Sequence, residues 1–228
     1  LNEALNYVSN LGFVPTMGTL HEGHISLIKK SKKFCKYTIV SIFVNPSQFN
    51  DKKDFIKYPR NLKSDLLILK KLKVDYVFVP KKKHIYYFKR KTKIKIIKKD
   101  KILCAKFRKG HFEGVLDVMD RLTKIINPNK IFMGEKDYQQ YYLVKKLIER
   151  KYKSKIIKCH TIRNKNKVAL SSRNLLLSKL DMNKASEIAK KLFIFKRKII
   201  LQKNISKYLN NKKSELSELF KVKIEYLE

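Results

Sequence analysis

Tryptophan is absent from this chain of 228 residues, and glycine (6), proline (5) and cysteine (3) are scarce. So little glycine and proline excludes collagen-like and proline-rich proteins. Cys35, Cys104 and Cys159 are odd in number and widely spaced, with no CxxC metal spacing, which favours reduced thiols over a disulfide framework. No apolar run approaches the ~20 residues that cross a bilayer, and no signal peptide opens the chain. We therefore expect a cytoplasmic protein with no membrane partner.

Acidic residues are also few, because 55 Lys and Arg stand against 19 Asp and Glu and give a net charge of +36. Such a balance suggests a nucleic-acid or anionic-membrane partner. Only 8 of the 55 basic residues are Arg, which leaves 55 − 8 = 47 Lys, whereas specific nucleic-acid recognition favours Arg. The hydrophobic content of 43% is ample for a core and excludes a disordered basic tail. The excess of Lys is better interpreted as compositional drift, with no specific nucleic-acid partner.

Strand-like and helix-like segments alternate along the chain, as in a parallel sheet with helical crossovers. The predicted strands are Gly12–Pro15, Thr38–Val44, Val74–Val79, Lys130–Met133 and Lys155–Cys159, with an edge strand or hairpin at Thr92–Ile96. The predicted helices are Glu22–Phe34, a segment with Leu62, Leu66, Leu69 and Leu72 at helical spacing, Val115–Ile126, Tyr138–Arg150 and Ser178–Gln202. A smaller C-terminal part is expected to begin near Thr161.

The segment PTMGTLHEGH (Pro15–His24) follows a strand and opens a helix. In this arrangement free backbone N–H groups and the helix dipole receive phosphate. His21 and His24 are three positions apart, so both can reach the same phosphates and stabilise a departing pyrophosphate. A helix cap with two surface histidines is the main alternative, and a zinc site is a weaker one because no third ligand is evident.

Three other segments carry candidate binding groups. VNPSQF (Val44–Phe49) follows a strand, where Asn45 and Gln48 would hold a small polar substrate. MGEKDYQQ (Met133–Gln140) also runs from strand to helix, and ALSSRN (Ala169–Asn174) offers hydroxyls and one Arg. Each is also compatible with an ordinary turn or capped helix. Lys is nevertheless absent from 11–28, 37–51, 110–123 and 168–178, which cover most of the candidate segments.

Seven blocks occur in one order along residues 12–174: PTMGTLHEGH, SIFVNPSQF, DFIKYPRNLKSD, VDYVFVP, RKGHFEGV, FMGEKDYQQ and ALSSRN. Together they resemble the pantothenate synthetase (pantoate–β-alanine ligase) family of the HxGH nucleotidyltransferase superfamily. The resemblance implies a Rossmann-like α/β domain that binds ATP and pantoate over residues 1–161, with a parallel sheet and flanking helices. It also implies a smaller, shortened C-terminal α+β domain over residues 162–228.

The same resemblance implies a cytoplasmic, homodimeric ligase of pantothenate biosynthesis that condenses pantoate with β-alanine. ATP and Mg²⁺ are required, a pantoyl-adenylate forms, and pyrophosphate and then AMP are released. The catalytic residues implied are His24 as proton donor, His21, Lys136 and Arg173, while Gln48 and Gln140 bind pantoate. The residues implied in ATP binding are Met17, Gly18, Thr19, Leu20, His21, Glu22, Gly23, His24, Gly134, Glu135, Lys136, Asp137, Ile162, Leu170, Ser171, Ser172 and Arg173. No metal ligands are assigned.

Two positions depart from the family pattern: Lys109 stands where Pro is typical and Asp117 where Thr is usual. Two alternative functions compete with the ligase. Another HxGH nucleotidyltransferase, such as a cytidylyltransferase, is disfavoured by Gln48, Gln140 and the VNPSQF block. A basic nucleic-acid-binding protein would show steep salt dependence at a localised patch.

Overall fold

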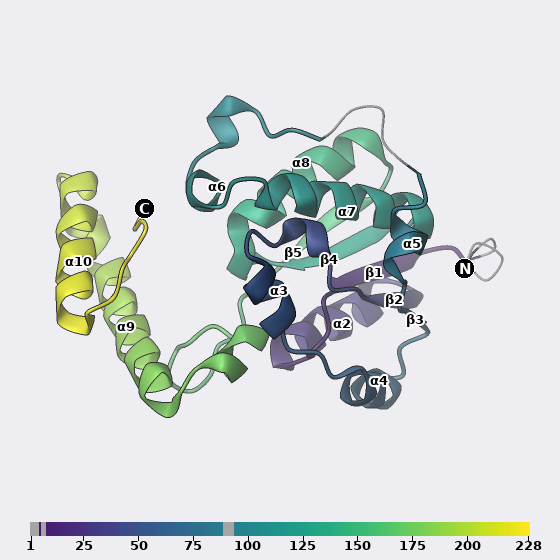
Figure 1. Ribbon diagram of the computed structural model, residues 1–228, viewed down its shortest axis with the longest axis horizontal. Helices are drawn as coiled ribbons and strands as arrows, with labels where there is room; N and C mark the ends of the chain where they lie inside the picture. The colour runs from purple at the N-terminus through teal and green to yellow at the C-terminus, as the bar shows by residue number, and fades with distance from the viewer. Residues whose placement is uncertain (1–4, 6–7, 89–93) are drawn as a thin grey trace. The chain divides into compact units, whose positions relative to one another are not determined.

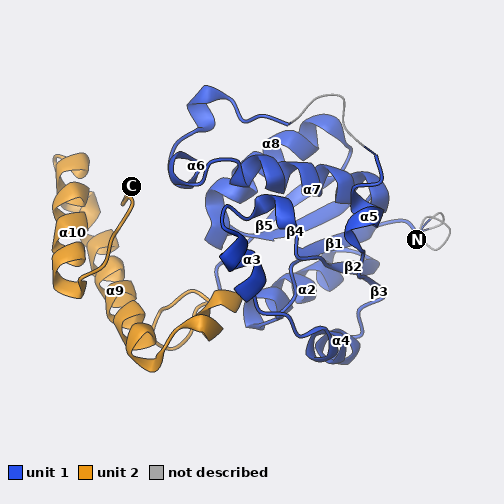
Figure 2. Cartoon of the chain, in the orientation of Figure 1, with its two compact units in different colours: residues 1–162 blue, residues 163–228 orange. Residues whose placement is uncertain are grey.

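The computed structural model describes residue 5, residues 8–88 and residues 94–228 of the chain. Its contacts divide it into two compact units, Leu1–Ile162 and Arg163–Glu228, shown in Figure 2. The first unit contains the sheet and the helices around it, and the second is helical (Figure 1). The assignment of ATP and pantoate binding to residues 1–161 as a separate domain stays a prediction.

Five parallel strands form one sheet in the order β3-β2-β1-β4-β5. The chain runs outward from β1 to β2 and β3, then returns to the other side of β1 to add β4 and β5. The strands are β1 (Leu11–Thr16), β2 (Tyr37–Ile42), β3 (Tyr76–Phe78), β4 (Lys130–Gly134) and β5 (Lys155–Cys159). The predicted parallel sheet with flanking helices is confirmed. Because the order reverses between β1 and β4, a ligand site is expected at the carboxyl ends of these strands.

Helices cover both faces of the sheet. The longer helices of the first unit are α2 (Glu22–Phe34), α4 (Leu62–Lys71), α7 (His111–Ile126) and α8 (Tyr138–Lys151). The short helices are α3 (Lys52–Lys57), α5 (Lys82–Ile85) and α6 (Cys104–Phe107), and the 3₁₀ turns are η1 (Pro46–Gln48), η2 (Lys98–Asp100) and η3 (Glu135–Asp137). No described helix is both long enough and apolar enough to cross a membrane.

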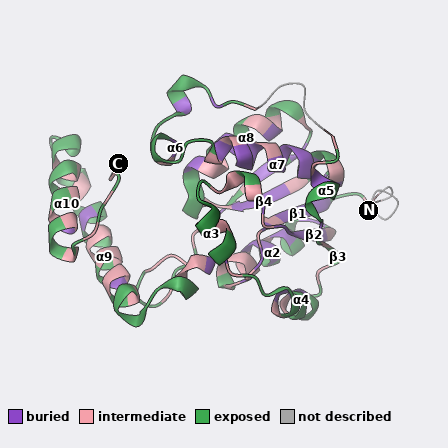
Figure 3. Cartoon of the chain, viewed as in Figure 1, coloured by how far each residue is buried: buried purple, intermediate pink, exposed green. Residues whose placement is uncertain are grey.

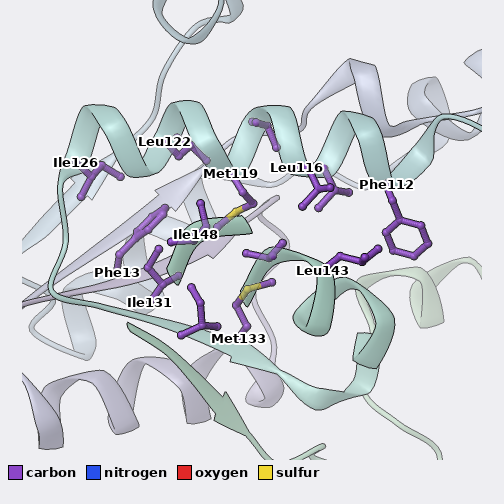
Figure 4. Packing of buried hydrophobic residues seen from close by; sticks show 14 of the residues in the cluster. Phe13, Phe112, Leu116, Met119, Leu122, Ile126, Ile131, Met133, Leu143 and Ile148 are labelled. Atoms are coloured by element: carbon purple, nitrogen blue, oxygen red, sulfur yellow. The ribbon is translucent and has the colours of Figure 1, made fainter. Parts of the chain in front are cut away.

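Alternation along the strands builds a core on each face, because successive side chains point to opposite sides. Phe13, aligned with Ile39 and Ile131 on the neighbouring strands, packs against α7 and α8 in the cluster of Figure 4. Val14 and Phe132, the next residues along, join the opposite cluster with α2 and α4. Burying a side chain of this size contributes about 1.5–3 kcal/mol. Figure 3 shows that the buried residues gather in β1, β2 and β4 and along much of α7.

The second unit contains η4 (Ser172–Leu176), α9 (Lys179–Lys198), η5 (Ile199–Leu201) and α10 (Ile205–Phe220). Phe195 and Leu216 are its buried apolar residues. Its extended pairing is limited to one antiparallel bridge between Arg163 and Ala169, so the expected β component of this part is reduced to that bridge. Of the strand or hairpin expected at Thr92–Ile96, residues 92 and 93 lie outside the described residues and residues 94–97 form no regular element.

Candidate active site at the carboxyl ends of β1, β2 and β4

A tight turn leads from β1 into α2. Gly18 and Thr19 both have left-handed backbones, with φ of +82° and +53°. A β-branched residue rarely adopts this conformation, so the surrounding structure must hold Thr19 there. The Thr16 hydroxyl accepts from the Gly18 N–H at 3.2 Å, and the Thr19 hydroxyl donates to the Pro59 carbonyl at 2.7 Å. The turn is therefore fastened to the segment between α3 and α4.

The strongest hold on this turn comes from Asp65, which the sequence did not single out. Its Oδ2 accepts from the Thr19 N–H at 2.8 Å and its Oδ1 from the Leu20 N–H at 2.7 Å. The Asp65 residue is only 2% exposed. In the sequence, Asp65 is marked only by its place in the DFIKYPRNLKSD block. Its contact with Thr19 joins residues 46 positions apart, which no local pattern indicates.

The two histidines of the turn form a reciprocal cap on α2. His21 is the N-cap residue, and its Nδ1 accepts from the Gly23 N–H at 3.1 Å. The Nδ1 of His24 accepts a longer bond, at 3.4 Å, from the His21 N–H. Since each Nδ1 acts as an acceptor, the neutral tautomer carries its proton on Nε2. The ring centroids lie 4.1 Å apart, and neither residue is fully buried.

Both imidazoles are held in the neutral form. Burial, with smaller contributions from His21 and Lys136, lowers the pKa of His24 to about 3. Burial and the charge of Lys136 lower the pKa of His21, against an opposing effect of Glu22. At neutral pH the pair therefore offers two uncharged Nε2–H donors beside one lysine cation.

The backbone N–H groups of this turn are mostly occupied within the chain. Acceptors are already present for the N–H groups of Gly18, Thr19, Leu20, His21 and Gly23. The expectation that free N–H groups here would cradle phosphate is wrong for these five, because local side chains and Asp65 use them. The side-chain groups that this region still offers to an anion include the imidazole Nε2–H groups and the Lys136 ammonium.

The turn η1 after β2 holds Gln48 near the same place. Gln48 Nε2 lies 3.1 Å from the Met17 Sδ, and its Oε1 accepts from Asn45 Nδ2 at 3.2 Å. Asn45 is 1% exposed and also binds the Gly114 carbonyl and the Tyr86 hydroxyl. Its expected role as a substrate contact is therefore replaced by a structural one, whereas Gln48 is partly exposed and adjoins Met17.

Helix α7 packs closely on η1 at Gly114. A Cβ at that position would lie 2.2 Å from the backbone oxygen of Ser47, so only glycine permits this approach. His111, in the first turn of α7, places its Nδ1 2.6 Å from the Gln48 carbonyl oxygen. The backbone and side chain of Gln48 are thus both positioned by neighbouring polar groups.

Of the site residues predicted after β4, Lys136 lies near the two histidines, whereas Glu135 is bonded to the end of β5. Lys136, 35% exposed in its side chain, lies 3.3 Å from the Asp137 carboxylate and acts electrostatically on both histidines. Glu135 accepts instead from His160 Nδ1 at 3.1 Å and from the Thr161 N–H, which ties η3 to the end of β5. These hydrogen bonds lower the pKa of Glu135. Gly134 has open space around its Cα.

The two glutamines that begin α8 have different environments. Gln139 is buried and bonds the Ala105 N–H and the carbonyls of Asp100 and Ile102. Gln140 is partly exposed, and its side chain makes no hydrogen bond to the described residues. Its amide is therefore available to a ligand, and its part in binding pantoate stays a prediction.

The remaining predicted ATP contacts lie at the end of the first unit and in the second. Ile162, the last residue of the first unit, is 36% exposed. Leu170, Ser171, Ser172 and Arg173 belong to the second unit, where Ser171 caps η4 by accepting from the Arg173 N–H at 3.3 Å. Their part in binding ATP stays a prediction.

Asp117, which departs from the family pattern, is paired. Both of its carboxylate oxygens lie 3.1 Å from Arg121 Nε one helical turn later. Arg121 is 5% exposed, bonds the Ile85 and Phe88 carbonyls, and stacks on two aromatic rings. The carboxylate of Asp117 is thus neutralised locally.

Comparisons with known proteins cover nearly the whole chain. A family model described as pantoate-beta-alanine ligase matches residues 2–228. A pantothenate synthetase of Leptospira biflexa is 44% identical over 223 residues, covering 96% of this chain and 78% of that protein. One from Pseudothermotoga lettingae is 40% identical over 220 residues, with the same coverage of 96% and 78%.

Two crystal structures are similar in fold. Pantothenate synthetase from Thermus thermophilus superposes with a TM-score of 0.87 at 30% identity, covering 95% of this chain and 80% of that one. Pantoate-beta-alanine ligase from Francisella tularensis, complexed with beta-gamma ATP and beta-alanine, has a TM-score of 0.81 at 41% identity, covering 93% and 82%.

Proposed function

The chain belongs to the pantoate–β-alanine ligase family, and we propose that its site joins pantoate to β-alanine at the expense of ATP. One observation supports the assignment of these residues to a single site. The Met17–Gln48 contact brings the histidine turn after β1 against the polar turn after β2, beside Lys136 from the end of β4. The groups proposed to bind phosphate and the small substrate thus lie near one another where the strand order reverses.

In the first step a carboxylate oxygen of pantoate attacks the α-phosphorus of ATP. A new O–P bond forms while the bond from that phosphorus to pyrophosphate breaks, which gives pantoyl-adenylate. His21 and His24 donate Nε2–H hydrogen bonds to phosphate oxygens, and Lys136 offsets the charge that builds on the departing pyrophosphate. With a pKa of about 3, His24 fits hydrogen-bond donation better than the transfer of a proton from an imidazolium.

In the second step the amino group of β-alanine attacks the acyl carbon of the adenylate. The C–N bond forms, the C–O bond to AMP breaks, and the amine loses a proton. Gln48 and Gln140 would hold pantoate between the two steps, since their amides can bind hydroxyl and carboxylate groups. Orienting the two reactants in this way supplies much of the rate enhancement.

Mg²⁺ is proposed to arrive with ATP. The described residues contain no group of three or more His, Cys, Asp or Glu side chains that could hold a metal ion. Mg²⁺ usually keeps several waters and binds chiefly through substrate phosphates, so a dedicated protein cage is not required. When bound, the ion would offset phosphate charge.

The proposed setting is a cytoplasmic homodimer, which the family resemblance and the three free cysteines support. Light scattering of the purified protein tests the dimer. No membrane or specific nucleic-acid partner is proposed.

The function is tested by measuring AMP formation with ATP, pantoate and β-alanine, omitting each in turn. Pyrophosphate release should require ATP and pantoate, and AMP release should additionally require β-alanine. AMP formation that is independent of pantoate would contradict the proposal.

A further inference from the structure

Helix α4 buries two of its residues, and its Ile68 packs partly buried against the core that contains Leu69. Leu62 and Leu66 remain 43% and 41% exposed, while Asp65 and Leu69 are its two buried residues. Leu69 packs in the core under the sheet. Asp65 instead directs a carboxylate at the turn before α2, where no described Lys or Arg pairs with it and two backbone N–H groups satisfy it. Burying a carboxylate costs desolvation free energy, which an apolar side chain at the same position would not.

The Asp65 carboxylate determines the shape of that turn. Its bonds to Thr19 and Leu20 hold the left-handed backbone at φ +53°, which a threonine would otherwise leave. The fit is close, because a Cβ on Gly18 would lie 2.9 Å from the Asp65 Oδ2. Charge-assisted bonds of this kind are stronger than neutral ones.

The backbone conformation of the turn determines how the two histidines are oriented. Leu20 is anchored twice, by its N–H on Asp65 and by its side chain in the core. His21 is the next residue and the N-cap of α2, and its N–H is the donor to the His24 ring. A rotation of the Thr19–Leu20 peptide would therefore reorient the cap and both rings.

We propose that Asp65 is a positioning residue for the reaction, fixing the Thr19–Leu20 backbone so that His21 and His24 present their Nε2–H groups to the same phosphates. This role rests on the proposed function. A misplacement of about 1 Å in such a site can cost about a hundredfold in rate. The alternative is that Asp65 contributes only to stability.

The test compares Asp65→Asn with a matched control, Asp120→Asn. Asp120 is also 2% exposed, but its carboxylate binds Lys151 and Tyr152 at 2.8 Å, near the amino end of β5 and opposite the candidate site. Both variants lose a buried carboxylate. They are assayed for pantoate-dependent pyrophosphate release where circular dichroism shows them folded. We expect Asp65→Asn to lower kcat by about tenfold to a hundredfold and Asp120→Asn to stay within about twofold of wild type.

A second readout does not depend on activity. The chain has 5 histidines, so imidazole NMR signals can be assigned through single substitutions. In the wild type, His24, with a pKa of about 3, should remain neutral between about pH 5 and pH 8, and His21 should titrate below the ordinary range of a histidine. In Asp65→Asn the pKa of at least one should rise toward the ordinary value, because the ring leaves its shielded place beside Lys136 and the other histidine; Asp120→Asn should leave both unchanged.

The outcomes distinguish a failure of the proposed function from a failure of the positioning role of Asp65. An inactive wild type contradicts the proposed function and with it a role of Asp65 in the reaction, even if the histidine titrations show that Asp65 fixes the geometry of the two rings. An active wild type with equal kcat losses in the two variants, or histidine titrations unaltered by Asp65→Asn, overturns the positioning role. If Asp65→Asn does not fold, Asp65→Ser, which lets water reach the freed N–H groups, takes its place with the same expectations.

Discussion

The rings of His21 and His24 have centroids 4.1 Å apart and planes tilted by 37°, and each Nδ1 accepts a hydrogen bond from a backbone N–H of the helix start. The cap therefore selects the tautomer, and the two Nε2–H groups are left for a ligand. A neutral pair avoids the repulsion that two adjacent imidazolium ions and Lys136 would suffer. The site thus combines the Lys136 ammonium with two uncharged donors.

Replacing His24 with Ala should reduce pantoate-dependent pyrophosphate release by about 10²–10³-fold, the usual loss when a transition-state hydrogen-bond donor is removed. The fold should persist, since the cap bond lost is the longer one, at 3.4 Å. His84→Ala, at an exposed position outside the site, is the control. Full activity in His24→Ala would exclude the proposed role.

Stability should depend on pH through His24. Its pKa falls from 6.5 to about 3 on folding, so between these values the unfolded chain binds more protons. The free energy of unfolding should therefore decrease as the pH drops from 6.5 toward 3, by up to about 1.4 kcal/mol per pH unit from this residue. Urea unfolding at about pH 7, 6 and 5 should show a shallower dependence in His24→Asn. Parallel curves for the two proteins would contradict the depressed pKa.

Substituting Lys136 with Met should raise the KM for ATP by about tenfold or more, because the ammonium offsets phosphate charge. It should also raise the pKa of His21, which Lys136 lowers. Lys158→Met is the matched control: its side chain is 45% exposed, and its ammonium lies 3.8 Å from the Glu135 carboxylate. Steady-state kinetics with varied ATP distinguishes the two; equal effects would place Lys136 outside the phosphate site.

Gly114→Ala should destabilise the protein by about 1–3 kcal/mol, the usual cost of overpacking. The new Cβ would lie 2.2 Å from the Ser47 oxygen, so η1 or α7 must shift. The KM for pantoate should rise with it because Gln48 belongs to η1. For thermal unfolding, Gly134→Ala is the comparison, since its Cβ would meet open space. Unchanged stability in Gly114→Ala would contradict the close packing.

The Asp117–Arg121 pair should show a coupling of about 1–3 kcal/mol in a double-mutant cycle of Asp117→Asn and Arg121→Met. Removing either partner alone takes this ion-pair contact from the other, whose side chain is largely shielded from water, and should lower the free energy of unfolding. Chemical denaturation of the four proteins measures the coupling. Additive losses would indicate that the aromatic and carbonyl contacts of Arg121 alone determine its contribution.

The strongly patterned elements were predictable from the sequence. The predicted limits of α2 and β5 coincide with those observed, because a helical stripe and a short apolar run are local signals. Helix α10 was not predicted, since its segment is weakly patterned and Leu216 is its one buried residue. Packing within the second unit stabilises α10, and that packing leaves no pattern in the local sequence.

The sequence indicated which residues would lie near the carboxyl ends of the strands better than it indicated their hydrogen bonds. His21, His24, Gln48 and Lys136 were expected from blocks that follow strands. The occupation of the backbone N–H groups was not, because it depends on Asp65, 46 positions from Thr19. Nor was the structural role of Asn45, which depends on Gly114 and Tyr86. Contacts between distant segments carry no local signal.

The most direct test of the account follows oxygen through the reaction. Pantoate labelled with ¹⁸O in its carboxylate is converted with ATP and β-alanine, and the released AMP is examined by mass spectrometry. Formation of an acyl-adenylate predicts that each AMP carries one ¹⁸O atom, because the C–O bond breaks in the second step. AMP without the label, or ADP in place of AMP, would contradict the proposed chemistry.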